Sequence, residues 1–269
     1  MLKLMYITNK PSVASIAEKA GVDRIFIDLE TIDKAKRQGG MDTVQSHHTL
    51  DDVAVIRQML TKADLLVRSN HIHAGSKTEI DTIIRNGAAI VMLPYFKTVN
   101  EVAKFIDLID GRAKVCLLVE TPEAVDKIDA ILELEGIDEI HIGLNDLHLA
   151  YGLRFMFEVL TNGTVERLAD KFQAKGIPFG FGGIARLKAG DLPAEAVIKE
   201  HYRLGSSMAI LSRSFCNTDI ITDLEEIQEV FMSGIKDIRN LEKEVASYKD
   251  YFESNHLLIE HLVSDIANR

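Results

Sequence analysis

Polar side chains able to do chemistry stand directly after short apolar segments of the chain. Glu120 follows one such segment, and Asp146 follows the next, in Gly143-Leu-Asn-Asp146. Two carboxylates that converge with free space between them suit a hard divalent cation that keeps several waters. Arg68 lies at the end of an earlier segment, and an arginine can hold a planar carboxylate through two parallel hydrogen bonds. These residues predict a site for a metal ion and a small carboxylic acid, although each carboxylate alone could instead cap a helix.

Eight short apolar segments, each followed by an amphipathic stretch, must position these side chains. The segments are almost continuously apolar, which is typical of strands buried on both faces of a parallel sheet. Eight strand–helix units close into a barrel. An open doubly wound sheet is less favoured, because no glycine-rich dinucleotide loop follows the first segment. The polar residues 30–48 are interpreted as a long loop. The predicted strands span residues 2–8, 24–30, 64–70, 89–94, 114–120, 139–143, 178–184 and 208–212, and the predicted helices span 12–20, 49–61, 77–86, 99–109, 122–134, 165–174 and 194–202.

The predicted fold class is a single (β/α)8 TIM barrel over residues 1–218, with a long C-terminal helical extension over residues 219–269. The C-terminal ends of the strands form the mouth of such a barrel, where active sites lie. Glu120 and Asp146 then follow adjacent strands at the same level of the mouth, with Arg68 nearby. The fold class thus brings the candidate residues together.

The C-terminal extension has its own pattern. Apolar residues recur at steps of three and four from Ile220 to Phe252, which predicts a helix with an apolar seam of period near 3.5. A continuous helix of this length would reach roughly 50 Å at ~1.5 Å per residue and would overshoot the wall of its own barrel. A neighbouring subunit that covers the distal half would avoid an exposed apolar stripe. We therefore expect a homo-oligomer whose interface includes Leu241, Val245, Tyr248 and Phe252. The alternative is two helices that fold back on the same barrel.

The composition limits the classes of partner. Among 269 residues, 31 are Lys or Arg and 41 are Asp or Glu, which gives a formal net charge of −10. Such a surface repels nucleic acid and anionic membranes, and no apolar run approaches the ~18 residues of a membrane span. The two cysteines, Cys116 and Cys216, cannot form a disulfide framework or a cysteine zinc site. We expect a cytoplasmic protein with no nucleic acid partner and no membrane partner.

Five stretches occur in the order and spacing of a known protein family. Through them the sequence resembles the HpcH/HpaI aldolase and citrate lyase β-subunit family, within the phosphoenolpyruvate/pyruvate barrel superfamily. The resemblance covers residues 2–152 and is looser in the second half of the chain. The stretches are Phe26-Ile-Asp-Leu-Glu30, Leu66-Val-Arg-Ser-Asn70, Gly87-Ala-Ala-Ile-Val-Met-Leu-Pro94, Leu118-Val-Glu-Thr-Pro-Glu-Ala124 and Ile142-Gly-Leu-Asn-Asp-Leu147.

The resemblance implies a divalent-metal-dependent carbon–carbon lyase or aldolase acting on a 2-oxo acid of the pyruvate or oxaloacetate type, with an aldehyde or a thioester as second substrate. It implies that Glu120 and Asp146 bind Mg²⁺, Mn²⁺ or a similar ion, which would stabilise an enolate as a Lewis acid. No Schiff-base lysine is then required, and none of the predicted strand ends presents a lysine. The residues implied to contact the substrate are Arg68, Gly143, Leu144 and Asn145.

The sequence leaves several candidates for the residue that transfers protons. In the aldolase branch of the family a histidine follows the glutamate after the second strand, whereas Thr31 stands there in this chain. Histidine has a suitable unperturbed pKa for proton transfer near neutrality. His141, between apolar neighbours in the sixth strand, is interpreted as an interior histidine with satisfied hydrogen bonds. The candidates are Glu30, His47 and His48, with His71 and His73 after the third strand.

Two other functions compete with the lyase hypothesis. Gly180-Phe-Gly-Gly183 ends the seventh strand and Ser212-Arg-Ser214 ends the eighth, where barrels commonly bind phosphate. With Arg186 or Arg213 they would suit a phosphate-binding isomerase or epimerase. Alternatively, the absence of a histidine at Thr31 suits a barrel that has lost its proton donor and serves as a non-catalytic subunit.

Overall fold

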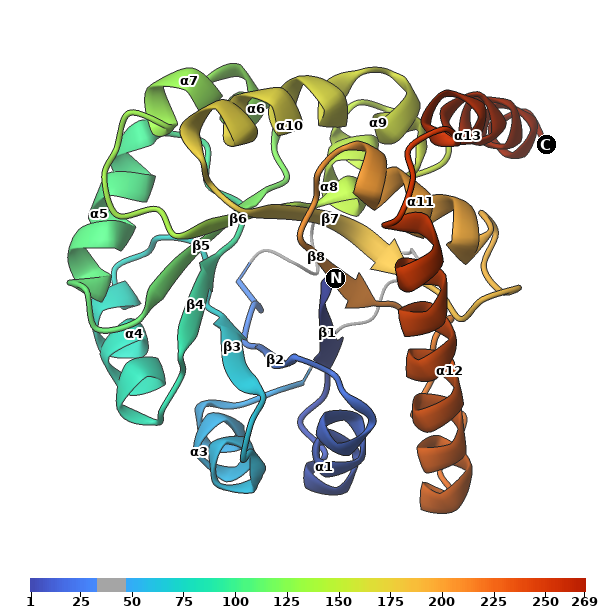
Figure 1. Ribbon diagram of the computed structural model, residues 1–269. Coiled ribbons are helices and arrows are strands. Elements are labelled where there is room, and N and C mark those ends of the chain that lie inside the picture. Colours follow the sequence, from blue (N-terminus) through green and yellow to red (C-terminus); the bar gives the residue numbers. More distant parts are fainter. Residues whose placement is uncertain (33–46) are drawn as a thin grey trace.

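The computed structural model describes residues 1–32 and 47–269, and it shows eight parallel strands closed into a barrel in chain order (Figure 1). The predicted TIM-barrel class is confirmed. Most of the predicted loop 30–48 lies outside the described residues. The strands are β1 (Lys3–Ile7), β2 (Arg24–Asp28), β3 (Asp64–Arg68), β4 (Ile90–Leu93), β5 (Lys114–Val119), β6 (Glu139–Ile142), β7 (Phe179–Ile184) and β8 (Met208–Leu211).

Helices surround this barrel, and local signals set several of their ends. Pro11 occupies the first turn of α1, and Gly21 ends that helix in the left-handed conformation at φ 101°, which glycine adopts at little cost. Thr49 and Thr98 each begin a helix with a capping box. The helices are α1 (Pro11–Ala20), α3 (Leu50–Met59), α4 (Ser76–Arg85), α5 (Val99–Ile109), α6 (Pro122–Asp126), α7 (Ile128–Ile131), α8 (Leu144–Ala150), α9 (Glu158–Thr161), α10 (Thr164–Lys175), α11 (Ala194–Arg203), α12 (Leu224–Val245) and α13 (Phe252–Ala267).

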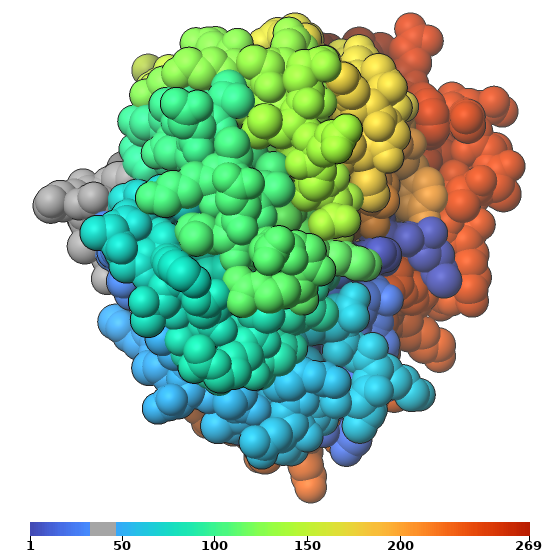
Figure 2. All heavy atoms as spheres, turned by 90° about the vertical axis from the view of Figure 1, so that its left-hand side faces the viewer, coloured from blue at the N-terminus to red at the C-terminus, as the bar shows by residue number. Residues whose placement is uncertain are grey.

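Two differences from the sequence prediction lie near the mouth of the barrel. The single helix predicted over 122–134 is two short helices, because Lys127 leaves the helical conformation at φ −99° and ψ 8°. The residues after β6 form α8 directly, a helix that the predicted spans do not include, and Asp146 lies in its first turn. The chain between β2 and β6 covers the face seen in Figure 2, whereas α11, α12 and α13 lie on the opposite side of the barrel in Figure 1.

A buried ion pair lies at the N-terminal end of the barrel interior. Arg24 begins β2 and Glu139 begins β6, and the two side chains form hydrogen bonds of 2.6 and 2.8 Å. Both residues are buried, so the pair is desolvated and depends on its own good geometry. Above it lies an apolar cluster made of Met5, Phe26, Leu66, Ile90, Met92, Cys116, Leu118 and Met208. The interior is thus filled below the mouth.

The predicted continuous C-terminal helix is wrong. Helix α12 ends at Val245, and α13 folds back against α9 and α11, whereas α12 packs along α1 (Figure 1). Buried Glu242 on α12 accepts hydrogen bonds from the Leu2 N–H at 2.5 Å and from the Tyr202 hydroxyl at 3.0 Å. The alternative of two helices on the same barrel therefore holds. Val245, which we expected in a subunit interface, is buried within the chain itself, and the homo-oligomer stays a prediction.

Among residues 1–32 and 47–269, no helix combines the length and the apolar character needed to cross a membrane.

Candidate active site

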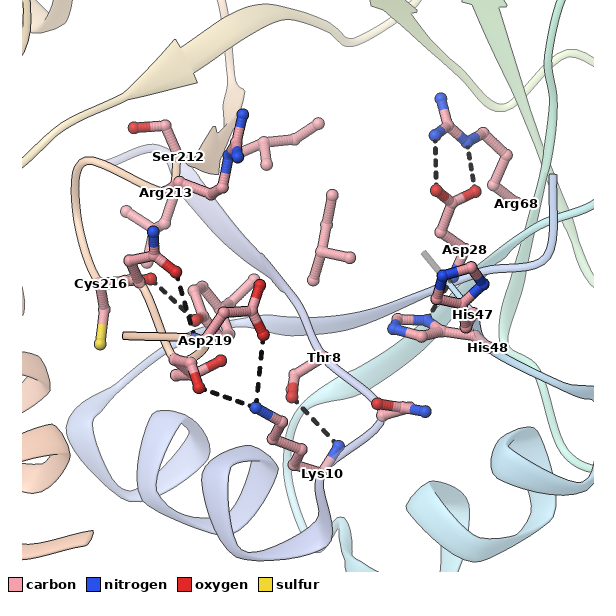
Figure 3. Close-up of a pocket in the computed structure, with 17 residues that line it drawn as sticks. Thr8, Lys10, Asp28, His47, His48, Arg68, Ser212, Arg213, Cys216 and Asp219 are labelled. Carbon is pink, nitrogen blue, oxygen red and sulfur yellow. Dashed lines mark hydrogen bonds and ion pairs between the residues drawn. The ribbon is translucent and has the colours of Figure 1, made fainter. Parts of the chain in front are cut away.

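Two cavities lie side by side at the C-terminal ends of the strands. The first, which we call the Glu120 cavity, has a volume of about 200 Å³ and is bordered by Glu120, Asp146 and the segment 143–145. The second, the Lys10 cavity, has a volume of about 620 Å³ and is drawn in Figure 3. The residues that border both cavities are Ile7, Arg68, Ile210 and Ser212.

Glu120 follows β5 and depends on the glycine beside it. Its side chain is buried, and its Oε1 accepts a hydrogen bond of 2.9 Å from the Tyr95 N–H. A Cβ on Gly143 would lie only 2.6 Å from the Glu120 Cβ and 2.9 Å from Oε2. The Gly143 N–H in turn bonds to the Val119 carbonyl at 2.9 Å. The glycine therefore allows the end of β6 to approach the carboxylate closely.

Asp146 reaches the same cavity from the first turn of α8. The structure thus brings together the two carboxylates that the sequence proposed as a pair. Their oxygens suit a hard cation such as Mg²⁺ or Mn²⁺. Within the described part of the chain, no group of three or more His, Cys, Asp or Glu residues could hold a metal. A cation at this site would therefore take its remaining ligands from water, substrate or backbone.

Arg68 is held by a carboxylate of the protein itself. Its Nε and Nη2 each donate a hydrogen bond of 2.8 Å to Asp28 (Figure 3), and Nη2 lies 3.5 Å from the Glu30 carboxylate. Burial opposes the charge on Arg68, but Asp28 and Glu30 outweigh it and raise its pKa. The guanidinium also lies over the Phe26 ring, 5.7 Å from its centroid.

The predicted two-bond grip of Arg68 on a substrate carboxylate therefore does not fit this arrangement. Asp28 already accepts hydrogen bonds from Nε and Nη2 of the guanidinium. Among the described residues, no hydrogen bond uses the third nitrogen, Nη1. Asp28 and Arg68 are direct partners in the register between β2 and β3. Arg68 can thus offer a substrate a rigidly positioned positive charge rather than two parallel bonds.

The acid–base candidates are placed very differently. Glu30 is buried and borders neither cavity; its N–H bonds to Asp28 Oδ1 at 3.2 Å and its carboxylate faces Arg68. His48 is half-buried and accepts the Asp28 N–H at Nδ1 over 3.0 Å, which leaves the proton of its neutral form on Nε2. His47 is exposed. Both histidines border the Lys10 cavity beside Asp28 (Figure 3).

The histidines after β3 lie outside these cavities. His73 uses both ring nitrogens locally, with Glu79 Oε2 at 2.8 Å and the Gly75 N–H at 3.0 Å. His71 borders neither the Glu120 cavity nor the Lys10 cavity. Thr31, at the position of the family's histidine, has its N–H bonded to Asn70 Oδ1 at 2.9 Å. These residues organise the loops rather than the cavities.

The glycines after β7 have a packing role. A Cβ on Gly180 would lie 2.3 Å from the Met208 carbonyl oxygen, so this glycine is required for the contact with β8. Gly182 has φ 51°, and a Cβ there would lie 2.8 Å from Leu144. Arg213 borders the Lys10 cavity. Close packing therefore explains glycines that the phosphate hypothesis would use as an anion cradle.

The sequence reasoning gave no role to Asp28 or to His141. Asp28 was visible at the end of a predicted strand, but its partner depends on side-chain conformation. His141 borders the Glu120 cavity. His141 shares one face of β6 with Glu139 and with Gly143 just beyond the strand, so the two-residue period of a strand was the signal that could have predicted that it lies beside the cavity.

The fold and these cavities define a (β/α)8 barrel with a carboxylate-lined pocket at the mouth, the place where barrel enzymes hold their active sites. The chain belongs to the HpcH/HpaI aldolase/citrate lyase family, whose sequence profile matches residues 3–157. Family membership indicates a lyase of the aldolase or citrate lyase type.

Two solved structures are similar in fold. An HpcH/HpaI aldolase from Desulfitobacterium hafniense DCB-2 aligns with a TM-score of 0.62 and 16% identity, over 88% of this chain and 93% of that one. A HpcH/HpaI aldolase/citrate lyase family protein from Burkholderia cenocepacia J2315 aligns with a TM-score of 0.60 and 16% identity, over 84% of this chain and 95% of that one. No curated protein matches the sequence.

Proposed function

We propose that the protein is a divalent-metal-dependent carbon–carbon lyase or aldolase that acts on a 2-oxo acid of the pyruvate or oxaloacetate type. The observation that carries the proposal is that Glu120 and Asp146 border one cavity together with Arg68 and the segment 143–145. Two carboxylates beside a fixed arginine suit a site that binds a cation and an anionic substrate together.

Glu120 and Asp146 would hold the metal, Mg²⁺ or Mn²⁺. When bound, such a cation supplies Lewis-acid stabilisation of the enolate that forms when a bond to the carbon next to the keto group breaks or forms. Tyr95 fixes one oxygen of Glu120 through its N–H. Gly143 leaves room beside the other oxygen. The carboxylate is thus oriented by the backbone before any ligand arrives.

The remaining residues of the cavity would bind and orient the acid. Arg68 places a partly buried positive charge at the boundary of the two cavities, and Asp28 fixes its orientation. Gly143, Leu144 and Asn145 line the wall next to Glu120, where their backbone can contact the substrate. We assign these four residues to substrate binding.

Among the acid–base candidates, the geometry favours His48. It is half-buried, it is anchored by the Asp28 N–H, and it borders the Lys10 cavity. Its Nε2 carries the proton in the neutral form and can exchange it with a substrate. The Lys10 cavity is about three times as large as the Glu120 cavity and would receive the aldehyde or thioester. His47 is the exposed alternative, and Glu30 acts on Arg68.

The test separates metal binding from proton transfer. Oxaloacetate decarboxylation needs a cation and a bound acid but no aldehyde, and deuterium uptake by the methyl group of pyruvate in D₂O needs a base as well. Metal-stripped protein should do neither, and Mn²⁺ should restore both. Glu120→Gln and Asp146→Asn should lower both rates at least ~100-fold, as expected for loss of a group acting in the transition state.

Glu123→Gln is the matched control, because Glu123 is a half-exposed carboxylate paired with Lys97 and borders neither cavity. It should keep both activities. Turnover that persists in metal-stripped buffer would refute the metal-dependent mechanism. Tight binding of Mn²⁺ and oxalate with neither activity would instead support the non-catalytic subunit.

A further inference from the structure

A buried histidine, His141, stands in the wall of the Glu120 cavity. His141 lies in the middle of β6, one strand layer below Gly143, and is only 1% exposed. Its neighbours in register are Leu118 on β5 and Gly180 on β7. It is therefore a polar ring in an otherwise largely apolar floor.

No hydrogen bond of normal length and angle joins either ring nitrogen of His141 to a described residue, and the polar contact of the ring with the Gly182 backbone is weaker than such a bond. A buried polar atom left in this state costs about 1–3 kcal/mol, so proteins rarely keep one without a use. The interpretation of His141 as a satisfied interior histidine is wrong on this point. Burial lowers its pKa to about 4, and an opposing interaction with the Gly182 backbone is weaker. The ring is therefore neutral near pH 7, with one donor and one acceptor nitrogen.

The space beside the ring is also maintained by the sequence. A Cβ on Gly180 would lie 2.9 Å from the His141 Nδ1, so a larger residue at position 180 would press on this nitrogen. His201 offers a contrast, because it is equally buried but does not border the Glu120 cavity. Its Nε2 also lacks a partner among the described residues, but its Nδ1 lies 2.8 Å from the Ser206 hydroxyl and its ring stacks on Phe181 at a centroid distance of 3.8 Å. His201 is thus held by contacts within the packed protein, whereas His141 borders the Glu120 cavity.

We propose that His141 is a substrate-contacting residue that donates a hydrogen bond, from the floor of the Glu120 cavity, to an oxygen of the bound 2-oxo acid. The inference rests on the proposed function, since it takes its ligand from there. A donor in a desolvated floor facing an anionic oxygen forms a strong charge-assisted bond. It would select acids that place an oxygen toward the floor, because an apolar group there would leave the imidazole unpaired.

The experiment compares variants of His141 with a matched variant of His201. His141→Leu removes the donor at similar volume, His141→Asn and His141→Gln retain an amide donor, and His201→Leu removes a buried histidine away from the cavity. Pyruvate affinity is measured by calorimetry with saturating Mn²⁺, together with kcat/KM for oxaloacetate decarboxylation and the thermal midpoint without ligand.

We expect His141→Leu to weaken pyruvate binding at least about tenfold, as for loss of a hydrogen bond to a charged group. Its thermal midpoint should stay the same or rise, because the variant removes the two ring nitrogens of residue 141 that lack a normal hydrogen bond to a described residue. Asn or Gln should recover part of the affinity. His201→Leu should lower the thermal midpoint and keep the pyruvate affinity.

Two results would overturn the inference alone: His141→Leu that binds pyruvate within about twofold of the wild type, or His141→Leu that loses stability and affinity in the same proportion as His201→Leu. A wild-type protein that binds neither Mn²⁺ nor pyruvate would overturn the proposed function, and this role of His141 with it.

Discussion

Replacing Gly143 with alanine tests the site without removing any functional side chain. The backbone of Gly143, at φ −84° and ψ 88°, is open to alanine, so the change adds no backbone strain. The new Cβ would, however, lie 2.6 Å from the Glu120 Cβ and 2.9 Å from its Oε2. The Cβ of Glu120 is tied directly to β5, so bond rotation in the side chain cannot relieve the clash.

The size of the effect follows from these distances. Carbon atoms in contact sit about 3.5–4.0 Å apart, so Glu120 or the end of β6 must move by about 1 Å. A displacement of that size at a reacting centre can cost about 100-fold in rate. Overpacking typically costs a further ~1–3 kcal/mol of stability. We therefore expect Gly143→Ala to fold, to lose about 100-fold in kcat/KM for oxaloacetate decarboxylation and to need more Mn²⁺ for half-maximal rate.

Gly136→Ala provides the control for lost stability. Gly136 precedes β6 at the opposite end of the barrel, has φ 90°, and would place its Cβ 3.0 Å from Ile106. Alanine is strained at positive φ, so this variant should lose ~1 kcal/mol and keep its activity. A Gly143→Ala protein with kcat/KM within threefold of the wild type would refute the assignment of Glu120 as a metal ligand.

Four further predictions follow from the same structure. Arg68→Lys should lose at least tenfold in kcat/KM despite the retained charge, since lysine cannot reproduce the fork to Asp28; near-normal kinetics would make Arg68 a purely structural residue. Ile259→Ala, in a fully buried position on α13, should lower the free energy of unfolding by about 3 kcal/mol in urea titrations while kcat stays unchanged, and a change in kcat would link α13 to the site. The free energy of unfolding should be highest above pH ~6.5 and fall as the pH is lowered toward 4. His141 and His201 have native pKa values of about 4 and about 3, so over this range they bind protons only after unfolding. Each then lowers the free energy of unfolding by about 1.4 kcal/mol per pH unit, and His201→Leu should halve that slope. Sedimentation at micromolar protein concentration should show a homo-oligomer whose interface buries the exposed side chains of Tyr248, Leu257 and Leu258. A monomer would contradict this expectation.

The barrel was predictable because every strand is buried on both faces and reads as an apolar run. The break between α12 and α13 was not, because residues 246–251 contain neither glycine nor proline. The chain turns there because Ile259 and Val263 find a buried surface on the same barrel. The spacing of apolar residues along the sequence predicts that a helix has an apolar face, but it does not predict which surface that face packs against.

The candidate site was predictable only in part. Glu120 and Asp146 share a cavity because β5 and β6 are neighbours, which the order of the segments already implied. The role of Asp28 could not be predicted from the order of the strands. Which carboxylate pairs with the Arg68 guanidinium depends on side-chain conformations. The missing partners of His141 are a property of the packed interior, since they depend on residues from strands far apart in the sequence.

The hydrogen bonds between α12 and the segment that precedes β1 also bear on how the protein folds during synthesis. Glu242 binds the Leu2 N–H, and Arg239 binds the Leu2 carbonyl oxygen at 2.7 Å, so the residue that precedes β1 is held by residues of α12 that are synthesised much later. Strand β1 must also wait for β8 before its second edge is paired. Until then the nascent chain carries an open sheet edge, the kind of surface on which other chains can pair. Ring closure is therefore a late, long-range event, and its delay exposes β1 to mispairing throughout synthesis.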